Sequence, residues 1–186
     1  ASNFCMLTHP IDELSAMTLG IVGYGDLGRG VARVAAAFNM DVIVAARPGS
    51  PDVPDGRVSF DELLRRADVI SLHCPLVDAT RGLFGAAEFR RMKSSAILIN
   101  TARGALVDTQ ALAAALRDGD IRAAAIDVLP KEPPIDGDPL LDYEGRNLIV
   151  TPHIAWGTRE ARQAGLDQLT ANIAAFLNGE EKNRVV

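Results

Sequence analysis

The stretch "LGIVGYGDLGRG", residues 19–30, decides the fold. Gly23, Gly25 and Gly28 stand there in the spacing G-x-G-x-x-G, after an apolar run and before a segment with helical apolar spacing. This context predicts a strand, a tight turn and a helix. Gly23 allows the turn, Gly25 lets the backbone approach a pyrophosphate, and Gly28 allows close packing of helix on strand. A glycine turn without a ligand is the alternative.

The start of this predicted helix is a candidate anion site. The amides near Asp26 and Leu27 point outward from the helix N-terminus, where free N–H groups and the helix dipole stabilise a negative charge. Together with the glycine spacing, this predicts that the loop binds the pyrophosphate of a dinucleotide.

The end of the second predicted strand bears on which dinucleotide binds. Ala46 and Arg47 stand where an acidic residue would accept hydrogen bonds from ribose hydroxyls. An arginine can instead pair with a 2′-phosphate, and Ser50 could donate a further hydrogen bond. We therefore expect NADP(H), with NAD(H) as the alternative. In that alternative, Arg47 is a solvated loop cation or stacks on the adenine.

Composition excludes several classes of protein. The 186 residues fit one domain, and a net charge of −5 argues against a nucleic-acid binder that relies on positive charge. No apolar run reaches the length of a membrane span, and the start of the chain does not resemble a signal peptide. Cys5 and Cys74 lie far apart, so we expect reduced thiols in a cytoplasm and no metal site.

Short β-rich runs alternate with helical patterns along the chain. Strands are predicted at residues 18–22, 41–46, 68–74, 96–100, 121–128 and 147–151. Helices are predicted after the glycine loop (with Leu27, Val31, Val34, Ala35 and Phe38 at helical spacing), after the capping box of Ser59 and Glu62, and at residues 85–93, 108–119 and 159–178. The alternation predicts an α/β fold with a doubly wound parallel sheet and its ligand site at the carboxyl ends of the strands.

Several polar side chains follow predicted strands at that edge. Arg103, Asp127, Glu132 and His153 come from separate strand ends and are the candidates for chemistry. Taken singly, Arg103 could be a surface ion pair, Glu132 a solvated loop carboxylate, and His153 a hydrogen-bonding residue at a helix entry. The other two histidines are not catalytic candidates. His73 is interpreted as a core residue with its hydrogen bonds satisfied, and His9 has no assigned role.

The motifs together carry a resemblance. They are "TLGIVGYGDLG", "ADVISLHCPL" followed by Thr80, "LINTARGALVD", "AAAIDVLPKEP" and "NLIVTPHIAW". The chain resembles the cofactor-binding domain of the D-isomer-specific 2-hydroxyacid dehydrogenases, and "FCMLTHPIDELS" and "HIAW" are most similar to the hydroxypyruvate and glyoxylate reductase (glycerate dehydrogenase) branch. The resemblance implies a single Rossmann-type dinucleotide-binding domain over residues 1–186. It also implies an N-terminal substrate domain that is absent from this chain.

The resemblance implies roles for the candidates. Arg103 would hold the substrate carboxylate and keto oxygen, His153 would protonate the carbonyl oxygen, and Glu132 would fix the imidazole. The implied cofactor contacts are Cys74, Pro75 and Thr80 along the groove, Thr101, Ala102, Arg103 and Asp127 near the nicotinamide, and His153 and Ala155. Trp156 is expected either to wall the substrate pocket or to pack under the last helix.

The leading function is therefore an oxidoreductase that transfers a hydride between NADP(H) and a small 2-keto or 2-hydroxy acid such as hydroxypyruvate or glyoxylate. A nucleotide-sensing, co-repressor-like module is the alternative, and a domain used only for assembly is a third reading. The resemblance implies a homodimer. It also implies that the 186 residues alone bind cofactor but turn over poorly.

Overall fold

The computed structural model describes residues 11–50 and 52–183, so Cys5 and His9 lie outside the described residues. The chain divides into two compact units, Ala1–Thr151 and Pro152–Val186. The first unit holds the sheet, and the second holds one long helix. The single domain predicted over residues 1–186 stays a prediction.

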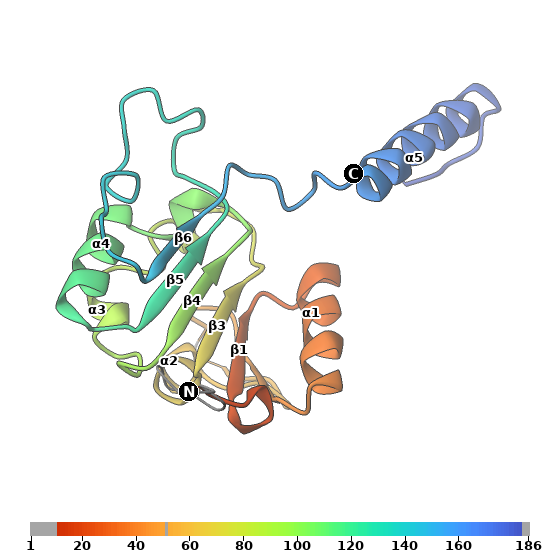
Figure 1. The fold of residues 1–186 in the computed structure, drawn as a ribbon. Helices are drawn as coiled ribbons and strands as arrows, with labels where there is room; N and C mark the ends of the chain where they lie inside the picture. The colour runs from red at the N-terminus through yellow and green to blue at the C-terminus, as the bar shows by residue number, and fades with distance from the viewer. Residues whose placement is uncertain (1–10, 51, 184–186) are drawn as a thin grey trace, which may run out of the picture. The chain divides into compact units, whose positions relative to one another are not determined.

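The first unit is built on one six-stranded sheet. Its strands are β1 Thr18–Val22, β2 Asp41–Val44, β3 Val69–Leu72, β4 Ile97–Asn100, β5 Ala123–Ile126 and β6 Leu148–Val150. All neighbouring strands pair in parallel, in the order β2-β1-β3-β4-β5-β6. Figure 1 shows the part of this order from β1 through β3 to β6. This arrangement confirms the predicted α/β fold with a doubly wound parallel sheet.

The strand order locates the ligand edge. The chain runs from β1 outward to β2 and then crosses to β3 on the other side of β1. In open parallel sheets, ligands bind beyond the carboxyl ends of the strands where the order reverses in this way, because the two following loops separate there. For this chain, that point lies between the loops after β1 and β3.

Short helices connect the strands. They are α1 Asp26–Ala37, α2 Phe60–Arg66, α3 Ala86–Phe89 and α4 Thr109–Asp118, with 3₁₀ helices η1 Leu14–Ala16, η2 Asp78–Thr80 and η3 Gly104–Leu106. Ser59 caps α2 as predicted, since its Oγ accepts the N–H of Glu62 at 3.1 Å. Gly119 ends α4 with φ 78°, also as predicted. The carboxylate of Glu62 pairs with Arg66.

Two apolar clusters cover the sheet. The larger contains buried side chains from α2, α3 and α4, among them Leu64, Phe89 and Leu112. The smaller lies under α1, which contacts the sheet through small residues, namely Gly28, Ala32 and Ala35. Val31 packs partly against this cluster, but the other large apolar residues of α1 and its C-cap are exposed: Leu27 by 75%, Val34 by 59% and the C-cap residue Phe38 by 57%. The apolar spacing thus predicted the helix, but most of its large members do not face the sheet.

The second unit contains α5, Arg159–Leu177. Thr158 caps it by accepting the N–H of Ala161 at 3.1 Å, and Gly179 follows it with φ 73°. The helix predicted at residues 159–178 is thus confirmed. The large apolar side chains of α5 are exposed: Leu166, Leu169, Ile173, Phe176 and Leu177. Among the described residues, α5 included, no helix is long and apolar enough to cross a membrane.

Candidate active site and cofactor groove

Two close backbone contacts fix the glycine loop after β1. Gly23 has φ 94°, and a Cβ built there would lie 2.4 Å from the backbone N of Cys74. A Cβ at Gly28 would lie 2.2 Å from the carbonyl oxygen of Gly23. Both distances are too short for any side chain, so glycine is required at these two positions. The loop is thereby pressed against the end of β3.

Gly25 has a different environment. It is the N-cap of α1, and a Cβ built there would meet nothing within 4 Å. Asp26 and Leu27, which follow it, are exposed at the start of the helix. The first turn of α1 therefore faces open space with outward N–H groups, and this space suits a phosphate group.

A groove of about 600 Å³ runs along the carboxyl ends of β1, β2 and β3. Five predicted cofactor contacts line it: Gly23, Arg47, Cys74, Pro75 and Thr80. Ser50 is not among its described lining residues, and its hydroxyl donates to the carbonyl of Asp52 at 3.0 Å. The charged side chains among the described lining residues are both arginines, Arg47 and Arg57. The groove is therefore an electropositive channel.

The groove wall formed by the end of β3 carries no charged or reactive side chain. Burial lowers the pKa of the His73 imidazole, whose Nε2 lies 2.9 Å from Ser71 Oγ, so the ring is neutral at pH 7. Burial raises the pKa of the Cys74 thiol, which keeps it protonated. The Thr80 hydroxyl donates to the carbonyl of Pro75 at 2.7 Å and fixes the turn after Pro75. These residues shape the groove and supply no nucleophile.

The loop after β4 carries Arg103, and Asn100 holds that loop. Asn100 is fully buried; its Nδ2 donates to the Arg103 carbonyl at 3.0 Å, and its Oδ1 accepts the Ala102 N–H at 3.0 Å. The Arg103 side chain is exposed, and its Nη1 donates to the Ala102 carbonyl at 2.7 Å. Thr101 is exposed beside them. One buried amide therefore sets the loop from which the guanidinium projects.

The loop after β5 carries Glu132 and packs against the Arg103 loop. A Cβ at Gly104 would lie 2.0 Å from the carbonyl carbon of Leu129, so the two backbones are in direct contact. The Leu129 N–H donates to Glu132 Oε1 at 2.7 Å, which fixes the carboxylate in its loop. Arg103 and Glu132 thus stand on two loops that the structure brings together.

Asp127 marks the same edge between β5 and β6. It is buried, and Thr151 Oγ1 donates to Asp127 Oδ1 at 2.5 Å. Thr151 directly follows β6, so this hydrogen bond joins the ends of two adjacent strands.

The described residues include no group of three or more histidine, cysteine or acidic side chains placed to hold a metal ion.

His153 and Ala155 belong to the second unit, in which both are exposed. His153 has φ 54°, and its carbonyl accepts the Trp156 indole N–H at 2.8 Å. The meeting of His153 with Arg103 and Glu132 stays a prediction, because those two residues belong to the first unit.

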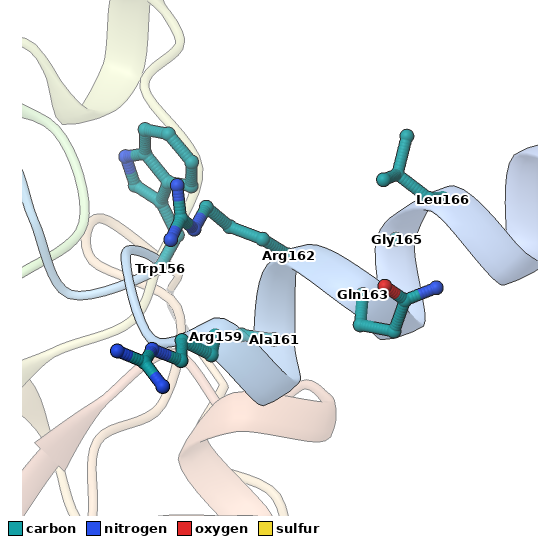
Figure 2. A pocket seen from close by; sticks show the side chains of 7 residues that line it. All are labelled: Trp156, Arg159, Ala161, Arg162, Gln163, Gly165 and Leu166. Atoms are coloured by element: carbon teal, nitrogen blue, oxygen red, sulfur yellow. The ribbon is translucent and has the colours of Figure 1, made fainter.

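Trp156 is exposed and is not packed beneath α5. It lines an open hollow of about 770 Å³ at the start of that helix, with Arg159, Ala161, Arg162, Gln163, Gly165 and Leu166. Figure 2 shows the side chain of Arg162 extending toward the indole. The role of Trp156 as a wall of the substrate pocket stays a prediction.

Sequence reasoning missed four residues that shape these sites: Tyr24, Arg57, Asn100 and Thr151. Tyr24 lies between Gly23 and Gly25, and its position inside the glycine loop could have identified it as a residue of the site. Asn100 ends a strand pattern, where a buried amide gives no periodic signal. Arg57 and Thr151 form hydrogen bonds with residues that are distant in sequence, and a pattern read along the chain does not reveal such contacts.

Comparison with known proteins identifies the family. Residues 4–155 match the model of the D-isomer specific 2-hydroxyacid dehydrogenase, NAD binding domain. The chain belongs to this family. It is 46% identical over 187 residues to a glycerate dehydrogenase of Methylorubrum extorquens, covering 100% of this chain and 58% of that relative. It is 36% identical to a hydroxypyruvate reductase of Blautia hydrogenotrophica, covering 98% and 57%.

A solved structure agrees with the observed fold. The NAD-complexed form of a D-isomer specific 2-hydroxyacid dehydrogenase from Lactobacillus delbrueckii ssp. bulgaricus superposes with a TM-score of 0.84 at 31% identity, covering 94% of this chain and 57% of that one. The chain therefore spans 57–58% of the length of these three relatives. Its matched domain is the part that binds a nicotinamide dinucleotide in this family.

Asn100→Ala should lower the free energy of unfolding by about 2–3 kcal/mol, because it removes two hydrogen bonds made by a fully buried amide and leaves a small cavity. Urea denaturation followed by circular dichroism measures this loss. Gln110→Ala, at an exposed position on α4, is the matched control and should cost less than about 0.5 kcal/mol. Equal stability of the two variants would contradict the role of Asn100 in holding the Arg103 loop.

Proposed function

We propose that the protein is an oxidoreductase that binds NADP(H) and reduces a small 2-keto acid such as hydroxypyruvate or glyoxylate. The observation that carries the proposal is the direct contact of the Arg103 and Glu132 loops at the same sheet edge as the electropositive groove. The relatives named glycerate dehydrogenase and hydroxypyruvate reductase support this substrate class.

The first unit fits a dinucleotide. Gly23 and Gly28 bring the loop into position, Gly25 leaves room at the start of α1, and the groove continues past β2. The pyrophosphate would be bound by the N–H groups at Asp26 and Leu27, with the adenosine end toward Arg47. Cys74, Pro75 and Thr80 would contact the cofactor along the groove, and Thr101, Ala102 and Asp127 would border its nicotinamide end. The bound cofactor supplies the hydride.

The catalytic roles are assigned to this chain's own side chains. Arg103 binds the substrate carboxylate through two parallel N–H groups, which orients the keto carbon. His153 donates a proton to the keto oxygen as the alkoxide develops, and accepts it in the reverse direction. Glu132 is the positioning residue that accepts a hydrogen bond from the imidazole and favours its protonated form. His153 and Ala155 also contribute to cofactor binding.

Two further parts of the proposal concern partners and location. The exposed apolar face of α1, formed by Leu27, Val34 and Phe38, favours a homodimer in which a second copy covers it. Cys74 is a free, buried thiol, which suits a cytoplasmic protein. A second domain that closes over the substrate is proposed from the family resemblance, and without it we expect cofactor binding with little turnover.

Fluorescence titration of the chain with NADPH and NADH tests the cofactor preference. We expect tighter binding of NADPH, since no acidic residue is among the described lining residues of the groove and Arg47 is one of them. Cofactor binding at least tenfold tighter for NADH would overturn the preference while leaving the dinucleotide site intact. No binding of either cofactor would overturn the proposed function itself.

A further inference from the structure

Arg57 occupies a fixed place in the groove that the sequence alone gave no reason to expect. It lies ten residues after Arg47, beyond a loop rich in proline and glycine. The chain returns to the sheet there, because Val58 forms a parallel bridge with Ala45. The Val58 N–H donates to the Val44 carbonyl at 3.0 Å, and the Ala46 N–H donates to the Val58 carbonyl at 2.7 Å. These bonds place Arg57 beside the end of β2.

The Arg57 side chain is held on two sides. Its Nη1 donates to the Ala45 carbonyl at 3.2 Å, and its guanidinium carbon lies 4.9 Å from the centre of the Tyr24 ring. Stacking on an aromatic face and a backbone hydrogen bond reduce the freedom of a long side chain before any ligand binds. A guanidinium has five N–H groups, so this arrangement leaves donors for an anion.

The charges of the groove favour an anionic ligand at this end. Arg47 and Arg57 both line the cavity, and no carboxylate is among its described lining residues. Tyr24 and Arg57 are half-buried, where an interaction between opposite charges is screened less than at the open surface. A phosphomonoester carries between one and two negative charges at pH 7 and offers three acceptor oxygens, which one arginine cannot satisfy alone.

We propose that Arg57 is a specificity-determining residue that, with Arg47, clamps the 2′-phosphate of NADP(H). This inference rests on the proposed function and deepens it, because it names the second cation and explains why it is preorganised. Arg47 projects from an exposed loop and supplies charge, whereas Arg57 supplies a guanidinium whose orientation is set by Tyr24 and Ala45. Tyr24 is the positioning residue for Arg57.

The test uses two fragments that lack the nicotinamide, so the catalytic residues do not influence the result. Isothermal titration calorimetry compares adenosine 2′,5′-bisphosphate with adenosine 5′-monophosphate on the 186-residue chain. We expect the wild type to bind the bisphosphate at least tenfold more tightly. Arg57→Met should lower this preference about tenfold by weakening the bisphosphate alone, since losing a charge-assisted contact costs roughly a factor of ten. Arg57→Lys should give an intermediate preference, because it keeps the charge but loses the planar fork.

Arg90→Met is the matched control. Arg90 is an exposed arginine at the end of α3 and is not among the described lining residues of the groove, so its removal should leave the preference unchanged. If Arg57→Met and Arg57→Lys weaken both ligands equally and keep the wild-type preference, Arg57 only supports the groove and the inference is overturned. If the wild type shows no preference for the bisphosphate, the proposed NADP(H) preference fails, and the inference fails with it. Arg57→Lys retains the cation and the long stem, and it keeps the test decisive if Arg57→Met does not fold.

Discussion

Gly25→Ala should lose no more than about 1 kcal/mol of stability, as expected for alanine at an N-cap, and bind NADPH at least tenfold more weakly. A Cβ at this position meets nothing within 4 Å, and its backbone, with φ −76° and ψ −161°, is accessible to alanine. The added methyl group would instead occupy the space in which we place the pyrophosphate. Thermal denaturation measures the first expectation, and fluorescence titration with NADPH measures the second.

The neighbouring Gly23 supplies the contrasting variant. Gly23→Ala should cost about 4 kcal/mol of stability, because φ 94° is strained for alanine and the new Cβ would lie 2.4 Å from the Cys74 backbone nitrogen. Urea denaturation distinguishes this variant from Gly25→Ala. Undiminished NADPH binding by Gly25→Ala would show that the pyrophosphate does not sit at the start of α1. Wild-type stability of Gly23→Ala would contradict the observed packing of the loop against β3.

His153→Gln should lower kcat for 2-keto acid reduction by about 10²–10⁴-fold, because glutamine cannot donate a proton to the developing alkoxide. The measurement requires the chain joined to the second domain that the family resemblance implies, so that turnover is measurable. NADPH affinity, measured by fluorescence, should change much less than kcat. A large decrease in kcat with a nearly unchanged NADPH affinity distinguishes loss of the proton donor from loss of the fold.

His9→Gln is a control for histidine substitution, since His9 carries no assigned role. It should leave kcat within about twofold of the wild type, because no part in the proton transfer is assigned to it. A decrease of less than about tenfold for His153→Gln would remove His153 as the acid. The proposed proton transfer would then need another donor.

The sheet and the glycine loop were predictable because their signals are local. The apolar run before Gly23 and the spacing of the three glycines each depend on neighbouring residues, and the structure confirms the strand, turn and helix they predict. The packing of α1 against the sheet was harder to predict from the sequence. Helical spacing identifies an apolar face, but close approach to the sheet at Gly28 selects small residues, so Leu27 and Phe38 stay exposed.

The site was predictable where strand ends carry polar residues and not where distant segments meet. Arg103 and Glu132 follow strands, and the structure brings their loops into contact. Arg57 depends on the bridge between Val58 and Ala45, which lie 13 positions apart and share no periodic pattern. The cofactor contact predicted for Ser50 stays a prediction; its hydroxyl donates to the carbonyl of Asp52 at 3.0 Å.

The backbone contact between Gly104 and Leu129 joins the loop after β4 and the loop after β5 into one structural unit. Because the backbones touch with no room for even a methyl group, a segment grafted after β4 must match the segment after β5 in shape. Libraries that vary either loop would therefore have to randomise both segments jointly and leave position 104 untouched. The same constraint would make natural divergence in one segment depend on compensating change in the other.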